Sequence, residues 1–91
     1  MENVTKVTQM SGRSGEGVRN QFEIHTEKGV YFQSYDSIIV FKPYSGKIKL
    51  DSHYWDYSKT TGKYRNQFLN ETKKETEAKI QAGVYELTNL N

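Results

Sequence analysis

His53 is the residue of this sequence that comes closest to a catalytic or metal-binding arrangement. It lies between Asp51 and Asp56, and an imidazole beside carboxylates can act as a general base or as one corner of a metal site. Neither a second histidine nor paired carboxylates join it at a recognisable spacing, so we interpret this segment as the polar end of a strand. His25 falls on the polar side of an alternating segment and is expected to face solvent.

Two other segments partly match phosphate-binding patterns. The loop 11–17 holds three glycines, but their order is not the dinucleotide fingerprint and no helical pattern follows. In TTGK, residues 60–63, Tyr57 stands where a phosphate loop needs glycine and Tyr64 where it needs Ser or Thr. Asp36 lies between hydroxyl residues in SYDS, residues 34–37, and could act as a base, but turn capping between two strands explains it better. The sequence therefore predicts no catalytic residue, no metal ligand and no cofactor, and we expect a protein that is not an enzyme.

The segment HYWDYSKTTGKYR, residues 53–65, combines aromatic rings with cations. Tyrosine, tryptophan and arginine are enriched at the centres of protein interfaces. Rings next to cations can also stack on bases and contact phosphates. We therefore predict a partner-binding surface that is composed of Trp55, Tyr57, Lys59, Lys63 and Arg65.

Helical spacing divides the side chains of this surface. Tyr57 and Tyr64 fall on one helical face with Thr61 and Phe68, at spacings typical of a packed helix. We therefore expect both tyrosines mainly to pack, with Tyr57 kept as a boundary residue of the surface. The three cations lie off that face and are expected to point to solvent, whereas Trp55 is not assigned by the pattern.

Alternation and turn residues predict the elements that position this segment. We expect strands at 2–10, 18–27, 30–35, 37–42, 47–51 and 84–90. In the second, Val18, Phe22 and Ile24 share one face, and Arg19, Glu23 and His25 share the solvated one. The fourth is apolar on both faces and is expected to be central and covered on both sides.

The helices are predicted from capping residues. Ser58 or Thr60 can cap the first helix. Thr72 and Glu75 form a capping box for the second, Glu75 can pair with Lys79, and Gly83 marks its end. The predicted fold class is α+β: a curled antiparallel sheet of about five strands, followed by two short helices and a final strand.

Length and composition describe a small domain with weak net charge. The 91 residues make one domain, 1–91, and 34% of them are hydrophobic. A core this thin favours association, either as a homo-oligomer or with a partner. The net charge is +2 and there is no cysteine, which excludes disulfides and zinc–thiolate sites. We see neither a secretory signal nor an apolar run that could span a membrane, so we expect a soluble intracellular protein.

The chain resembles small proteins of tailed bacteriophages and related mobile elements over about residues 31–91. QSYDSII, residues 33–39, and YWDYSKTT, residues 54–61, are the most specific parts of the likeness. The resemblance implies expression in the cytoplasm of an infected bacterium. Small phage proteins without catalytic sites are often stoichiometric inhibitors of host factors, including anti-CRISPR and other anti-defence proteins. The resemblance assigns no functional residues to this chain.

These observations together predict a non-enzymatic phage protein that binds and inhibits a bacterial host protein. The alternative is a small protein that binds single-stranded or duplex nucleic acid. Residues 58–70 contain three cations and no acid, which favours this alternative, whereas the acids spread through the predicted sheet oppose it.

Overall fold

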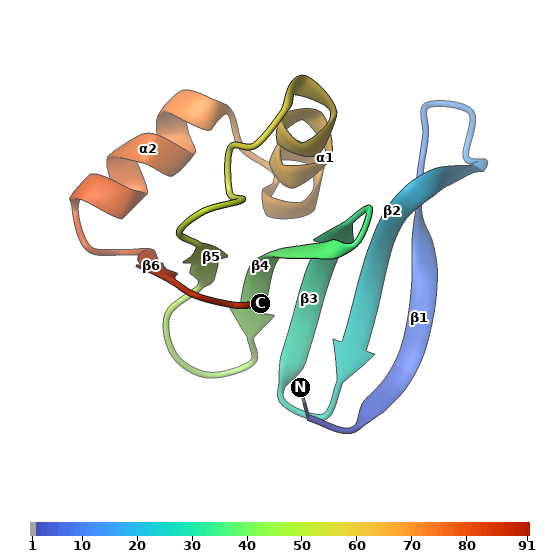
Figure 1. The fold of residues 1–91 in the computed structure, drawn as a ribbon, viewed down its shortest axis with the longest axis horizontal. Coiled ribbons are helices and arrows are strands. Elements are labelled where there is room, and N and C mark those ends of the chain that lie inside the picture. The colour runs from blue at the N-terminus through green and yellow to red at the C-terminus, as the bar shows by residue number, and fades with distance from the viewer. Residues whose placement is uncertain (1) are drawn as a thin grey trace.

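Six strands and two helices make up the protein, whose computed structural model describes residues 2–91. The elements are β1 (Val4–Ser11), β2 (Gly17–Thr26), β3 (Gly29–Ser34), β4 (Ser37–Pro43), β5 (Lys49–Asp51), α1 (Lys59–Leu69), α2 (Lys73–Gln81) and β6 (Glu86–Thr88). All strands belong to one sheet in sequence order. The helices lie beside the β3–β6 part, and the β1–β2 hairpin extends away from them (Figure 1). The predicted α+β class is confirmed.

The last strand differs from the rest in its direction. Strands β1 to β5 pair antiparallel, whereas β6 pairs parallel to β5. A parallel pair needs a crossover connection, and here α1 and α2 supply it. The two helices therefore return the chain to the same end of the sheet from which β5 starts.

The core lies between α1 and one face of the sheet. Phe32 on β3 is fully buried and stacks on Phe68 of α1, with ring centroids 5.7 Å apart. Glu23 is the register partner of Phe32 and so shares this inner face. The expectation that Glu23 and His25 lie on a solvated face is therefore wrong in part. The side chains of Glu23 and His25 are 35% and 29% exposed, because both residues lie on the covered face of the sheet.

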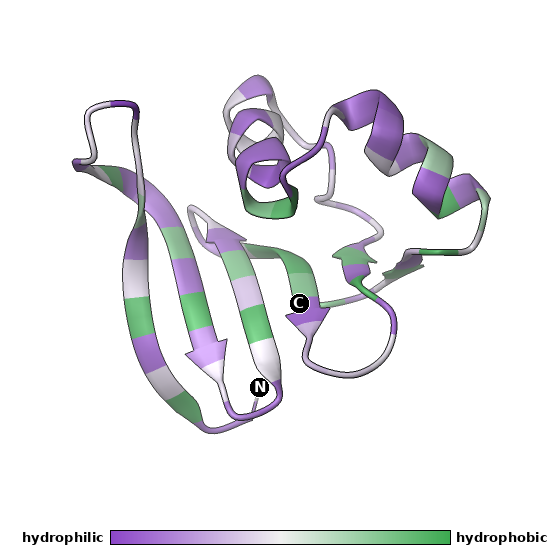
Figure 2. Cartoon of the chain, turned by 180° about the vertical axis from the view of Figure 1, so that it is seen from behind, coloured by the Kyte–Doolittle hydropathy of each residue, from purple (hydrophilic) through white to green (hydrophobic). Residues whose placement is uncertain are grey.

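The regular alternation of β2 is interrupted at Asn20. Its φ of 65° is left-handed, and the next residue, Gln21, is fully buried. Along the rest of β2 and β3, hydrophobic and hydrophilic residues alternate, while both helices are mostly hydrophilic (Figure 2). Alternation therefore identified the strands, but it did not identify which face the helix covers.

Strand β4 is an internal strand, as predicted, but it is covered on one face only. A register shift opposite β3 allows both Ile39 and Val40 to enter the core. Ile38 and Phe41 lie on the outer face and are only partly buried. The expectation of cover on both sides is wrong, because within residues 2–91 neither α1 nor α2 packs on the outer face of β4 (Figure 1).

The helix ends follow their capping residues. Ser58 caps α1, its Oγ accepting from the N–H of Thr61, and the Thr72–Glu75 capping box at the start of α2 is confirmed. Gly83 is left-handed, with φ of 76°, directly after the C-cap of α2. The expected Glu75–Lys79 ion pair is wrong. The Glu75 carboxylate is bonded to Thr72, and the Lys79 ammonium lies 2.6 Å from Glu71.

Candidate functional site

Asp51 fixes the start of the segment that leads from β5 to α1. Its buried carboxylate accepts hydrogen bonds from the backbone N–H groups of His53, Tyr54 and Leu90, at 3.1, 2.9 and 2.7 Å. Burial alone would raise the pKa of Asp51, but these bonds hold it below its usual range. The carboxylate is therefore occupied by backbone groups and is not placed to orient the His53 ring, which lies edge-on to Tyr54.

No group of three or more His, Cys, Asp and Glu side chains within residues 2–91 is arranged to hold a metal ion. Over the same residues, neither helix has the length and apolar character that a membrane span requires.

Arg65 is the residue that holds the predicted surface in place. It was expected to point to solvent, and this is wrong: it is 1% exposed. Its guanidinium donates to the carbonyl of Trp55 at 2.7 Å, and to side-chain oxygens of Asp56 and Asn66 at 3.2 and 2.9 Å. The side chain folds over Gly62, three residues earlier, where a Cβ would lie 3.6 Å from Nη2. Arg65 is therefore buried against the helix at Gly62, although it lies off the apolar face.

Asp56 joins this segment to both helices. Its carboxylate contacts Arg65 and also Lys73 at the start of α2, with the Lys73 pair at 2.7 Å. Burial would raise the pKa of Asp56, but hydrogen bonds from Lys73 and Arg65 hold it below its usual range. The two ion pairs tie residues 55–57 to α1 and α2 at once.

The remaining predicted contact residues lie at the surface. Tyr57 is 66% exposed, so the expectation that it packs on the helical face is wrong: it precedes the helix, which begins at Lys59. Lys59 and Lys63 are exposed and form no ion pair within residues 2–91. Trp55 is half-buried, with its ring 5.3 Å from the Arg65 guanidinium carbon.

Two hollows flank the first turn of α1. The larger, which we call the lysine cleft, measures about 520 Å³ and is lined by Asp56, Ser58, Lys59, Gly62, Lys63, Arg65, Asn66 and Lys73. The smaller, which we call the tyrosine cavity, measures about 120 Å³ and is lined by Ser34, Tyr35, Asp36, Ser37, Ile39, Tyr54, Tyr57, Ser58 and Thr61. Ser58 borders both. The tyrosine cavity was missed in the sequence, because it joins the β3–β4 turn to a segment about twenty residues away.

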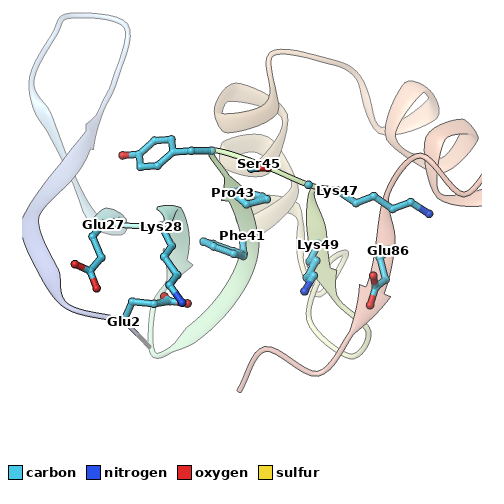
Figure 3. Close-up of a pocket in the computed structure, with 11 residues that line it drawn as sticks. Glu2, Glu27, Lys28, Phe41, Pro43, Ser45, Lys47, Lys49 and Glu86 are labelled. Atoms are coloured by element: carbon cyan, nitrogen blue, oxygen red, sulfur yellow. The ribbon is translucent and has the colours of Figure 1, made fainter.

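A third hollow lies on the outer face of the sheet. It measures about 500 Å³, and Figure 3 shows Phe41 between Glu27 and Lys28 on one side and Lys49 and Glu86 on the other. Phe41 stacks on Tyr31 at a centroid distance of 4.3 Å. One cross-strand row runs over all six strands here: Val7, Ile24, Tyr31, Phe41, Lys49 and Glu86.

This outer hollow has balanced charges. Glu2, Glu27 and Glu86 line it together with three lysines. The hydroxyl of Tyr31 donates to Glu2 at 3.1 Å, and burial together with this bond raises the pKa of Tyr31 to about 12. The outer hollow therefore has no net charge to select a ligand, in contrast to the two hollows beside α1.

A comparison with protein-family models matches residues 5–83 to DUF8033, a family of unknown function. The chain belongs to the DUF8033 family. The matched range contains α1, α2 and every residue that lines the lysine cleft and the tyrosine cavity. Neither curated proteins nor solved structures gave a match to this DUF8033 chain.

Proposed function

We propose that this DUF8033 protein is a non-enzymatic interaction protein that binds a bacterial host protein and inhibits it. In this proposal it is encoded by a phage or a related mobile element and acts in the host cytoplasm, with anti-CRISPR or other anti-defence inhibition as the class of activity. The start of α1, with Tyr57, Lys59 and Lys63 at its surface, is the contact region.

The observation that carries the proposal is an exposed ring on a fixed segment of backbone, next to Lys59 and Lys63, which form no ion pair within residues 2–91. Arg65 and Asp56 fix the backbone of residues 55–57 through a partly buried hydrogen bond and two ion pairs. Tyr57 nevertheless exposes 66% of its surface. A contact residue whose backbone is fixed before binding loses less conformational entropy in the complex, which favours its use as an interface anchor.

One partner protein of ordinary size can cover the contact region. A specific interface buries about 800 Å² on each partner, which is roughly a seventh of this protein's 5749 Å² surface. The first turn of α1 and the two hollows that border Ser58 lie next to one another. A single protein can therefore contact all three.

A pull-down from host lysate tests the proposal. The test variant is Tyr57→Ala/Lys59→Ala/Lys63→Ala. The matched control is Tyr44→Ala/Lys47→Ala/Lys74→Ala, which removes the same exposed residue types elsewhere on the surface. Wild type and control are expected to recover the same host protein and the test variant to lose it. Equal recovery by all three would show that the contact region is misassigned.

Nucleic-acid binding is the second candidate function, because Lys59, Lys63 and Lys73 line one cleft. Phosphate contacts by three lysines predict a log–log salt slope of about −2.7 on duplex DNA. A mobility-shift titration at low and moderate salt measures it. Absence of any shift at low salt would exclude this function and leave protein binding.

A further inference from the structure

We propose that the tyrosine cavity is the pocket for an arginine side chain of the partner protein. The proposal rests on the proposed function, because it names the chemistry by which the partner is recognised. The cavity is about 120 Å³, the scale of one inserted side chain.

The floor of the cavity is buried, and its hydroxyl groups already have hydrogen-bond partners. Ser34, Ile39 and Thr61 are 3%, 1% and 2% exposed. The hydroxyls of Ser34 and Thr61 are bonded at 3.0 Å. Ser58 Oγ accepts from the Thr61 N–H at 3.2 Å. These hydroxyl and amide groups are hydrogen-bonded to one another, so they do not need an anion such as phosphate as a further partner.

The rim of the cavity consists of tyrosine rings. Tyr35 and Tyr57 are 52% and 66% exposed. Tyr54 lies between solvent and core, with its ring centroid 5.4 Å from that of Tyr57 and the ring planes at 60°. Aromatic faces carry negative potential and attract guanidinium and ammonium groups. Three rings at one opening favour a cationic guest.

The charge of the cavity has the matching sign. Among the nine residues that line it, Asp36 is the only one with a charged side chain. Within residues 2–91 its carboxylate accepts one long bond, from Ser37 at 3.5 Å, and forms no ion pair. The nearby cations Lys59 and Lys63 line the lysine cleft instead. Asp36 is therefore an exposed carboxylate without a cation partner at the mouth of an aromatic pocket.

Tyr35 has a backbone conformation that is unusual for a residue other than glycine. Its φ is 56°, in the left-handed region, at the first position of the two-residue turn between Ser34 and Ser37. Glycine is the residue that fits such a position without strain. Two hydrogen bonds of 2.7 Å hold this conformation: the Tyr35 N–H donates to the Asn20 carbonyl, and the side-chain Nε2 of Gln33 donates to the Tyr35 carbonyl. Backbone strain beside a pocket supports the hypothesis that Tyr35 contacts the ligand.

Arginine fits these groups better than other side chains. Its planar guanidinium stacks on aromatic faces and forms bidentate hydrogen bonds with a carboxylate. A guanidinium that lies between the rings of Tyr35 and Tyr57 can donate both hydrogen bonds to the Asp36 carboxylate. A neutral analogue of the same shape retains the stacking but loses the ionic bond.

NMR titration of the isotope-labelled protein with N-acetylarginine amide tests the proposal. N-acetylcitrulline amide is the neutral, isosteric comparison. The arginine probe is expected to shift backbone amide signals of 34–39, 54–57 and 61, and the citrulline probe to shift them much less at the same concentration, because it keeps the stacking but lacks the ionic bond. Asp36→Asn and Tyr57→Ala are each expected to weaken arginine binding about fivefold, whereas Tyr44→Ala, an exposed tyrosine outside the cavity, leaves it unchanged.

Three results would overturn the proposal: no shift with arginine, equal shifts with citrulline, or undiminished binding by Asp36→Asn. This test is separate from the lysate experiment. If the arginine probe fails while Tyr57→Ala/Lys59→Ala/Lys63→Ala still loses the host protein, the arginine pocket is wrong and the contact region stands. If the probe binds but that variant retains the host protein, the contact region is wrong and this partner does not use the tyrosine cavity, because Tyr57 belongs to both.

Discussion

Arg65 shows how one side chain can change from a predicted contact to a structural support. Its position off the apolar helical face indicates exposure, yet it is buried against Gly62 and bonded to Trp55, Asp56 and Asn66. Periodicity treats a helix in isolation, so it cannot predict that the preceding loop folds over that helix. Exposure of Lys59 and Lys63, by contrast, was predicted correctly.

Replacing Arg65 is expected to destabilise the protein. Arg65→Ala leaves the Trp55 carbonyl without its donor and removes one cation from Asp56, so the free energy of unfolding should fall by about 3 kcal/mol. Urea denaturation measures this, and hydrogen exchange should show faster opening of 55–57. Lys63→Ala, two residues away and exposed, should stay within about 0.5 kcal/mol of wild type. Similar stability of the two variants would contradict the support role of Arg65.

Tyr35 allows the backbone strain to be measured directly. At φ of 56°, alanine pays a steric cost that glycine does not, so Tyr35→Gly should be more stable than Tyr35→Ala by about 1 kcal/mol. The comparison removes the ring in both variants and changes only the backbone preference. Urea midpoints of the two proteins give the difference. Greater stability of the alanine variant would mean that the left-handed turn is not maintained in solution.

At the scale of elements, the sequence predicted strands and helix ends well but their covered faces poorly. Alternation locates β2 and β3, and Ser58, the Thr72–Glu75 box and Gly83 mark the helices. These are local signals. The inner face of β2 was misassigned because Glu23 shares it with Phe32, a pairing between residues of two strands. The parallel direction of β6 also depends on the crossover through α1 and α2.

The packing of α2 against the last strand depends on one carboxylate. Glu71, whose side chain is 4% exposed, accepts hydrogen bonds from Thr76, Lys79 and Tyr85 at 2.6, 2.6 and 2.9 Å. Burial would raise the pKa of Glu71, but the bonds from Lys79, Thr76 and Tyr85 hold it below its ordinary value of 4.5. Tyr85 is in turn buried in the core cluster. Glu71 therefore links α2 to the core.

This linkage predicts a pH dependence with a defined sign. A lowered folded-state pKa means that the unfolded chain binds the proton more readily. The Glu71 contribution is therefore complete above about pH 4.5 and is lost as the pH falls through the lower folded-state pKa. Glu71→Gln should cost about 2 kcal/mol at pH 7 and make the acid loss shallower. Urea midpoints between pH 7 and 3 measure both. Parallel pH curves for the two proteins would contradict the assignment.

At the scale of the whole molecule, the candidate site is assembled from segments far apart in sequence. The lysine cleft takes its residues from 56–66 and 73, within reach of sequence reasoning. The tyrosine cavity combines 34–39 with 54–61, and this contact between the β3–β4 turn and the start of α1 exists only after folding. The exposure of Lys59 and Lys63 was therefore predictable from the sequence, whereas the burial of Arg65 and the tyrosine cavity were not. Homo-oligomerisation stays a prediction.

The affinity of the purified host protein, measured by calorimetry, tests the central claim that the start of α1 is the contact surface. Tyr57→Ala/Lys59→Ala/Lys63→Ala should bind at least about thirtyfold more weakly than wild type, the factor that corresponds to about 2 kcal/mol for a central anchor. Tyr44→Ala/Lys47→Ala/Lys74→Ala should bind as wild type does. Equal affinity of the first variant and wild type, or loss of affinity in the control alone, would contradict the claim.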